Sequence, residues 1–363
     1  MVESCDVGSL PFFGDFQKFL DGVSNQGRIV NDSTDFFEKE IVGSFVDKIT
    51  AGIDVPNYTQ YRDMTKMFFD LIGGVEKFNG GYIETAPLTL KNGKSAIPEV
   101  SAIKNHSREI YERLGEPFEL RFCVTGPYTL SSLLSYKNKG TFTRLGNALA
   151  QLVEANLFNV KEGSVRLVAV DEPVFGFVDD PLLDRGLEGR ENLLKAWETI
   201  IHEARSKGAQ TSLHLHNTSD ELFWEIKDLN VIEAHADDSF YQVKRTKERL
   251  ESTDKFLKAS IAVTDFDDLI RRHLIAMSKQ RLNATSVYEK IAETWKSLAK
   301  KQIDPTIFIE DAKIMRERLN KTIERFGVNR VPYFGPECGM RSFPTYESAL
   351  ECLRRVAQSA RTV

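Results

Sequence analysis

The feature that most limits how this chain can fold is a repeated alternation of short apolar runs with longer amphipathic stretches. Short apolar runs are typical of buried parallel strands, and apolar residues at helical spacing are typical of the helices that connect them. The predicted strands are 120–124, 167–170, 211–216, 231–235, 257–263 and 331–334, with weaker candidates at 4–8 and 51–55. The predicted helices are 144–161, 190–205, 241–250, 310–326 and 346–360.

Eight such alternations predict an α/β protein in which parallel strands close into a (β/α)8 TIM barrel. An open doubly wound sheet is the alternative. That class usually carries a glycine-rich phosphate loop after its first strand, and Gly8-Ser9-Leu10-Pro11 is not such a loop. No proline- or glycine-rich seam divides the sequence. We therefore expect residues 1–363 to form a single barrel domain, with an insertion around 82–115 that forms loops on one face.

The charges argue against some classes of partner. Lys and Arg number 48 against 53 Asp and Glu, and the two signs are mixed along the chain, which favours neither nucleic acid nor an anionic membrane as a ligand. The four cysteines have no spacing typical of a disulfide framework, and no apolar run approaches the ~20 residues of a membrane span. The first residues do not resemble a signal peptide, so we expect a reducing, cytoplasmic location.

Polar residues follow the carboxyl ends of the predicted strands. In a β/α barrel these ends converge on one rim, where active sites are built. The residues concerned are Gly8 and Ser9, Thr125-Gly126-Pro127, Asp171-Glu172-Pro173, His214 and His216, His235, Asp265 and Cys338.

The histidines and one cysteine of this rim have the chemistry of a metal site. His214 and His216 lie two residues apart on one strand and so share a face, as do Glu233 and His235 on the next strand. Cys338 lies in a glycine-flanked loop after the last strand. Imidazole and thiolate are ligands that zinc prefers, and a catalytic zinc keeps a position open for substrate. The predicted ligands are His214, His216, His235 and Cys338, with Glu233 as the alternative to His235; a metal-free cluster of hydrogen-bonded histidines is the other interpretation.

Motifs spread over nearly the whole chain resemble the catalytic, C-terminal domain of the cobalamin-independent methionine synthases. This family belongs to a superfamily that also contains uroporphyrinogen decarboxylase and methylcobalamin:thiol methyltransferases. The resemblance implies a TIM barrel and a zinc-dependent methyltransferase that methylates the thiol of homocysteine to form methionine. The matching pieces are 7–11, 62–64, 125–130, 170–173, the region of His214, 228–235 and 336–340.

The resemblance also implies roles for individual residues. Gly8 and Ser9 would hold the carboxylate of homocysteine, and Asp171 would hold its ammonium group. Asp171, His214 and Cys338 would be the catalytic residues. His214 and Cys338 match zinc ligands of the family.

Other positions depart from the family. His216 stands where the family has a cysteine. His235 aligns best with the family's glutamate, and Glu233 lies two residues earlier on the same face. No acidic residue occurs at 58–60, where the family has one for the amino-acid substrate. Leu133 replaces the tryptophan on which folate stacks, so the predicted methyl donor is methylcobalamin, a corrinoid protein or another non-folate carrier.

Several alternatives stay open at this stage. The acceptor could be another small thiol, methylated from methylcobalamin. A metal-free lyase similar to uroporphyrinogen decarboxylase would need a basic pocket, and the amino-terminal part of the chain has no arginine cluster for one. A zinc hydrolase on the same barrel would leave the Cys338 loop unexplained. The histidine at 216, where the family has cysteine, favours a barrel that has lost its activity, and metal content distinguishes that alternative from the others. The sequence leaves the methyl donor, the acceptor thiol, the choice between Glu233 and His235, and the oligomeric state undetermined.

Overall fold

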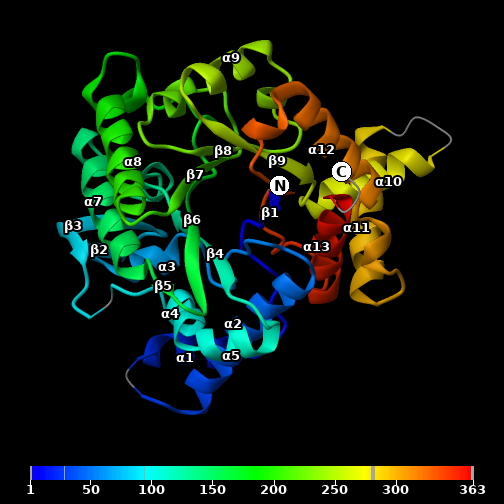
Figure 1. The fold of residues 1–363 in the computed structure, drawn as a ribbon, viewed down its shortest axis with the longest axis horizontal. Coiled ribbons are helices and arrows are strands. Elements are labelled where there is room, and N and C mark those ends of the chain that lie inside the picture. Colours follow the sequence, from blue (N-terminus) through cyan, green and yellow to red (C-terminus); the bar gives the residue numbers. More distant parts are fainter. Residues whose placement is uncertain (1, 28, 94, 279–282, 361–363) are drawn as a thin grey trace.

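The structure, a computed structural model, describes residues 2–27, 29–93, 95–278 and 283–360. A curled sheet of parallel strands forms its centre, and its order is β1-β10-β9-β8-β7-β6-β4 (Figure 1). The short strand β5 pairs with β6 in the antiparallel direction. The strands of this sheet are β1 (Glu3–Ser4), β4 (Phe118–Thr125), β5 (Asn159–Val160), β6 (Gly163–Glu172), β7 (Gln210–Leu215), β8 (Val231–Glu233), β9 (Phe256–Ala262) and β10 (Tyr333–Pro336).

The segment 55–60 closes this sheet into a barrel. It forms isolated parallel bridges on both sides, from Val55 to Cys5 next to β1 and from Asn57 to Arg121 of β4. A further bridge joins Gln60 to Ser9. Segment 55–60 therefore occupies the place of a second barrel strand, and the predicted α/β class with a barrel of parallel strands is confirmed.

Helices cover the outside of the barrel, and several of the long ones have the amphipathic pattern expected from the sequence. The capping box of α2 uses Asn31, whose side chain accepts from the backbone N–H of Ser33 and Thr34. The helices are α1 (Phe16–Asn25), α2 (Asp32–Thr50), α3 (Lys66–Phe69), α4 (Pro98–Asn105), α5 (Ser107–Leu114), α6 (Pro127–Ser131), α7 (Lys139–Asn156), α8 (Glu188–Ser206), α9 (Lys244–Ser252), α10 (Phe266–Met277), α11 (Ala284–Ala299), α12 (Ala312–Phe326) and α13 (Tyr346–Ala360).

A buried ion pair fastens α2 to the start of the barrel. Lys48 lies on the inner face of α2, and its Nζ donates to Asp6 Oδ2 at 2.8 Å and to the carbonyl oxygens of Gly8 and Asn57 at 2.9 and 3.0 Å. Asp6 Oδ1 accepts the backbone N–H of Asn57 at 2.6 Å. Both charged side chains are fully buried. The pair thus joins the first strand to segment 55–60, where the backbone ladder consists of single bridges.

Two predicted segments differ from the structure. Residue Ala51 of the expected strand 51–55 is the C-cap of α2, and the extended segment begins only at Val55. The segment 82–115, expected to form loops, contains most of β3 (Gly81–Leu90) together with α4 and α5. β3 pairs in the antiparallel direction with β2 (Ile72–Phe78), through a turn in which Asn79 and Gly80 both have positive φ.

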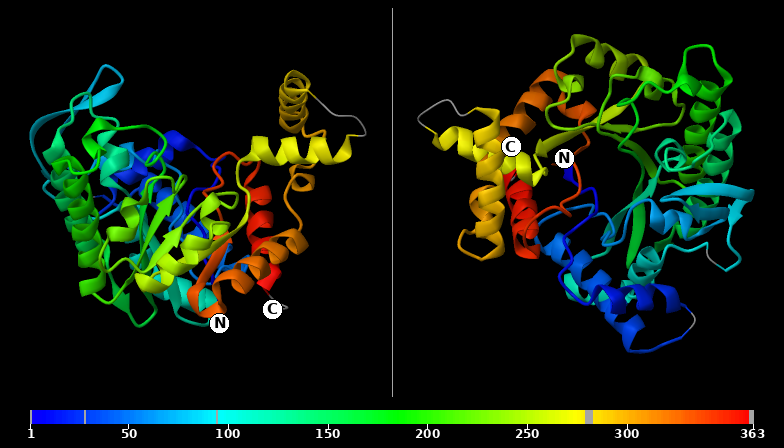
Figure 2. Two further views of the ribbon diagram at one scale, coloured as in Figure 1. Left: turned by 90° about the horizontal axis from the view of Figure 1, so that it is seen from above. Right: turned by 180° about the vertical axis from the view of Figure 1, so that it is seen from behind.

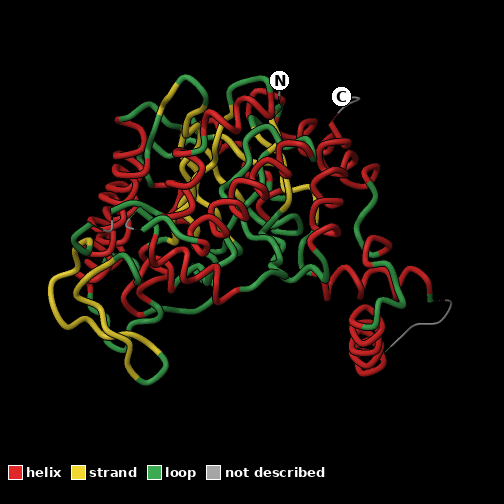
Figure 3. The backbone as a smooth tube through the Cα atoms, turned by 90° about the horizontal axis from the view of Figure 1, so that it is seen from below, coloured by secondary structure: helices red, strands yellow, loops and turns green. Residues whose placement is uncertain are grey.

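The β2–β3 hairpin and the pair α10 and α11 project from the barrel on the same side (Figure 2, left). The tube view shows them at opposite ends of the molecule (Figure 3). Among the described residues, no helix combines the length and the apolar character needed to cross a membrane.

Candidate metal and substrate site

The barrel strands place four polar side chains at one level of the barrel. Asp171 of β6 pairs in register with His214 of β7, and His214 pairs with Glu233 of β8. Glu233 in turn pairs with Lys258 of β9. All four residues are buried, each at most 4% exposed. Since neighbours in register on parallel strands point the same way, this layer forms a polar floor inside the barrel.

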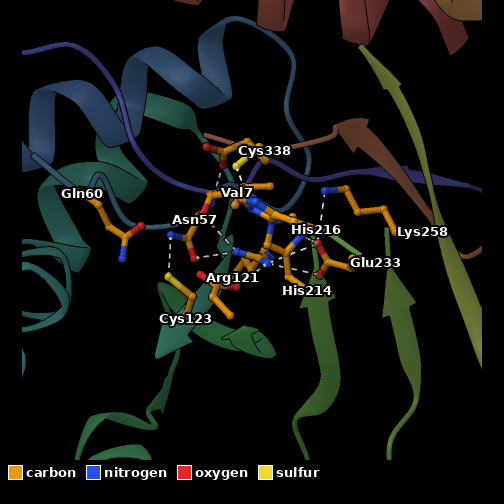
Figure 4. A network of polar contacts seen from close by, with 12 residues as sticks. Val7, Asn57, Gln60, Arg121, Cys123, His214, His216, Glu233, Lys258 and Cys338 are labelled. Atoms are coloured by element: carbon orange, nitrogen blue, oxygen red, sulfur yellow. Dashed lines mark hydrogen bonds and ion pairs between the residues drawn. The ribbon is translucent and has the colours of Figure 1, made fainter. Parts of the chain in front are cut away.

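His214 belongs to this floor and also to a second group, in which the structure brings it together with His216, His235 and Cys338. One potential ligand atom from each lies within 4.8 Å of all the others. Cys338 Sγ lies 3.4 Å from His216 Nε2, and both side chains point toward the same space (Figure 4). Four ligands around a tetrahedral zinc are separated by about 3.3–3.8 Å. The cluster therefore needs only a small contraction to surround one ion.

The chemical state of these side chains also fits a metal. Both ring nitrogens of His214 and Nε2 of His235 are buried without a hydrogen-bond partner, which is unfavourable unless something else binds them. Burial and neighbouring positive charge lower the pKa of His214 and of His235, and they lower the pKa of His216 to about 3. The imidazoles are therefore neutral, which is the form that binds metals. Burial raises the pKa of Cys338 to about 12, so in the absence of a cation its thiol keeps its proton.

Glu233 lies beside the cluster and is not a member of it. Arg121 Nη2 donates to both carboxylate oxygens at 3.2 Å, and Lys258 Nζ donates to Oε2 at 3.1 Å (Figure 4). Burial alone would raise the pKa of Glu233, but the two cations hold it below its usual range. The distance from Glu233 Oε2 to His214 Nδ1 is 3.8 Å. Of the two residues that the sequence left as alternatives, the structure groups His235 with the other three.

A cavity of about 150 Å³ adjoins the cluster. Asp171 lines it, and Oδ1 of this buried carboxylate has no hydrogen-bond partner, although Arg121 Nη2 lies 3.5 Å away. Burial raises the pKa of Asp171 to about 6, against the opposing effect of Arg121. The full lining is Val7, Ser9, Gln60, Arg62, Asp63, Met64, Asp171, Pro173, His214, His216, Cys338, Gly339 and Arg341.

Of the three residues predicted to bind the substrate, two line the cavity and Gly8 does not. Ser9 lines the cavity, as Asp171 does. Gly8 lies behind the wall, where its carbonyl oxygen accepts from Lys48. Gly8 has a φ of 133°, and a Cβ there would lie 2.2 Å from Asn57 Nδ2. Its contribution is therefore the backbone conformation that places Ser9.

Some residues of the site escaped the sequence analysis. Gln60 lines the cavity, and the bridge to Ser9 places it there. It lies in the stretch 58–60, where the family has an acidic residue and this chain has none. Lys258 holds Glu233 from the neighbouring strand β9, and Arg121 reaches it from β4, three strands away in the sheet. The available signal was a basic residue inside each of two otherwise largely apolar strands, because a buried cation needs a partner.

The comparisons with known proteins bear on the fold. No protein-family model matches the chain, and no curated protein matches it in sequence. A putative vitamin-B12-independent methionine synthase from Listeria monocytogenes matches in structure, with a TM-score of 0.60, 13% identity, and coverage of 100% of this chain and 98% of that one. A B12-independent methionine synthase from Shewanella sp. W3-18-1, solved in complex with selenomethionine, matches with a TM-score of 0.57, 14% identity and the same coverage. Over its whole length, this chain has the fold of the B12-independent methionine synthases.

Proposed function

We propose that the protein is a zinc-dependent methyltransferase that moves a methyl group from a non-folate carrier, a methylcorrinoid, to the thiol of homocysteine and so forms methionine. One observation carries the proposal: three neutral imidazoles and a thiol converge beside a small cavity that contains an unpartnered carboxylate oxygen. The fold shared with methionine synthases supports the same reaction class.

His214, His216, His235 and Cys338 would hold the ion. Zinc, when bound, would lower the pKa of an acceptor thiol from about 8.5, so that the reactive thiolate is present at neutral pH; because four protein ligands complete a tetrahedron, the sulfur would have to displace one of them or add as a fifth ligand. Asp171 is ionised above its pKa of about 6, and its free Oδ1 would accept a hydrogen bond from the substrate ammonium. The hydroxyl of Ser9 would donate to the substrate carboxylate from the same cavity wall.

In the transfer step a carbon–sulfur bond forms while the bond between the methyl group and its carrier breaks. The electron pair of the broken bond stays with the carrier, and the proton of the acceptor thiol goes to solvent. The residues of the cavity act by orienting the two reactants, because a positioned thiolate attacks far faster than one free in solution.

Leu133 supports a donor other than folate. Its backbone oxygen accepts from Tyr82 N at 2.9 Å, and its side chain packs against the hydrophobic core. An aliphatic side chain held in this way offers no aromatic ring on which a pterin could stack.

The test combines metal analysis with a transfer assay. We expect about one zinc per chain after purification without chelators, and methionine from homocysteine and methylcobalamin. Cys338→Ser and His214→Ala should lose metal and activity together, whereas Cys352→Ser, a control at a buried free cysteine of α13, should keep both. A protein free of metal, or one that uses only methyl-folate, would contradict the proposal.

A further inference from the structure

The charged side chains of the cavity wall are mostly engaged within the protein. Arg62 forms two hydrogen bonds of 2.7 Å with the carboxylate of Glu99. Asp63 Oδ1 accepts three hydrogen bonds at the start of α3, two of them from the backbone N–H of Thr65 and Lys66. Arg62 thus has its carboxylate partner, and the Asp63 carboxylate has local hydrogen-bond donors, with the charge of Arg341 nearby but not in an ion pair with it.

Arg341 is different among the described residues that line the cavity. Its one hydrogen bond runs from Nη1 to the carbonyl oxygen of Arg62 and is long, at 3.5 Å, and no carboxylate forms an ion pair with it. A guanidinium has five donors in a rigid fork that matches the two oxygens of a carboxylate. Arg341 thus presents donors for an anion at the wall of the site.

The backbone holds Arg341 close to Ser9. The N–H of Met340 donates to the carbonyl oxygen of Ser9 at 2.9 Å, which fastens the loop after β10 to the loop after β1. Gly339 makes this approach close, because a Cβ at that position would lie 2.0 Å from Ser9 Oγ. Ser9 and Arg341 accordingly line the same cavity, on two loops that this backbone hydrogen bond joins.

We propose that Arg341 binds the carboxylate of the acceptor and selects thiols that are also α-amino acids. The cavity then offers a carboxylate oxygen without a hydrogen bond, at Asp171 Oδ1, and a guanidinium without a paired carboxylate, at Arg341, which together complement a zwitterion. This inference rests on the proposed function for the identity of the acceptor. It adds a specificity-determining residue that acts alongside Ser9.

Binding of the product tests the inference without a turnover assay. Calorimetry would compare methionine with 3-(methylsulfanyl)propylamine, which lacks the carboxylate, on the zinc-loaded protein. We expect Arg341→Gln to weaken methionine binding about 10- to 100-fold and to leave binding of the amine unchanged. Arg341→Lys, which keeps the charge, should recover part of the loss. Arg354→Gln removes the same charge from the surface of α13 and should have no effect.

The outcomes separate this inference from the proposed function. Equal methionine affinities of wild type and Arg341→Gln, equal weakening of both ligands, or no methionine binding by the wild type would each overturn the inference. If methionine binds with the expected pattern but homocysteine is never methylated, Arg341 keeps its assignment and the proposed function falls. If homocysteine is methylated but Arg341→Gln binds methionine as tightly as the wild type does, the proposed function stands and the inference about Arg341 falls.

Discussion

At the scale of single residues, Glu233 is a buried carboxylate that lies next to the three histidines and Cys338 and is not one of the four candidate metal ligands. Arg121 and Lys258 neutralise its charge, and its Oε2 lies 3.8 Å from His214 Nδ1, which is beyond hydrogen-bond range. We propose that this contact shortens when an ion binds Nε2, so that Glu233 then orients the imidazole. Outer partners of this kind commonly change metal affinity when they are removed. On this proposal, metal binding depends on a residue that contributes no ligand atom.

We expect Glu233→Gln to lower the free energy of unfolding by about 3–5 kcal/mol, because two buried cations lose their compensating charge. Metal affinity should fall about 10- to 100-fold as His214 loses its orientation. Urea unfolding of the metal-free protein and a competition titration with a chelator would measure the two effects. Glu351→Gln, at a surface pair with Arg355, should change stability by less than about 1 kcal/mol. A Glu233→Gln protein with unchanged metal affinity would contradict the orienting role.

Part of the site could be predicted from residues alone. The alternation along a strand put His214 and His216 on one face, and the position of Cys338 after the last strand put it on the same rim. Arg121 and Arg341 could not be assigned in this way. Their roles depend on which side chains they contact in the folded protein. Those partners are distant in sequence, and no local sequence pattern indicates them.

At the scale of elements, His106 joins two helices through a pair of carboxylates. It lies between α4 and α5, and Nε2 is 3.0 Å from Glu38 Oε2 of α2 while Nδ1 is 2.9 Å from Glu109 Oε2. Partial burial lowers the pKa of His106, but the hydrogen bonds to the two carboxylates outweigh burial and raise the pKa above 6.5. The contact between α2 and α5 is thus strongest while the imidazolium is charged.

This raised pKa makes the contact sensitive to pH. A group whose pKa is higher in the folded state contributes its full stability below the unfolded value of 6.5 and loses it as the pH rises through the folded value. We expect the difference in Tm between wild type and His106→Gln to be largest near pH 5.5 and to shrink toward pH 8.5. Calorimetric scans across that range would measure it. A difference that grows with pH would show that His106 is neutral in the fold.

Elements with a local signal could be predicted well, and elements held by distant contacts could not. The helix predicted at 346–360 is α13 with the same bounds, and 190–205 lies within α8. Segment 55–60 was missed because it has no continuous ladder and includes Pro56; contacts from β1, β4 and Lys48 hold it in place. The β2–β3 hairpin was not among the predicted elements, although the dipeptide Asn79-Gly80 is a typical signal of its two-residue turn.

At the scale of the whole molecule, closure of the barrel depends on the first strands meeting the last ones. β1 pairs with β10, and segment 55–60 connects β1 to β4 through single bridges. The Lys48–Asp6 pair therefore supports the part of the barrel wall with the fewest backbone hydrogen bonds.

We expect Lys48→Met to lower the free energy of unfolding by about 3–5 kcal/mol, since it leaves the buried carboxylate of Asp6 without its cation. The double variant Asp6→Asn/Lys48→Met should be less destabilised than Lys48→Met, because no uncompensated charge remains. Lys66→Met, at an exposed pair with Asp70, should stay within about 0.5 kcal/mol of wild type. Urea unfolding of these three variants and of Asp6→Asn gives the comparison, and additive effects of the two buried substitutions would contradict the pairing.

The sequence distance between the clustered ligands has a further consequence. Cys338 and His216 are 122 residues apart along the chain, and β9 with α10, α11 and α12 lies between them. An ion held by both would bind the folded chain, in which these distant ligands meet, and would bind the unfolded chain far more weakly. Removing the ion would therefore lower the free energy of unfolding, so the four side chains that the proposed reaction needs would also hold the two halves of the barrel wall together.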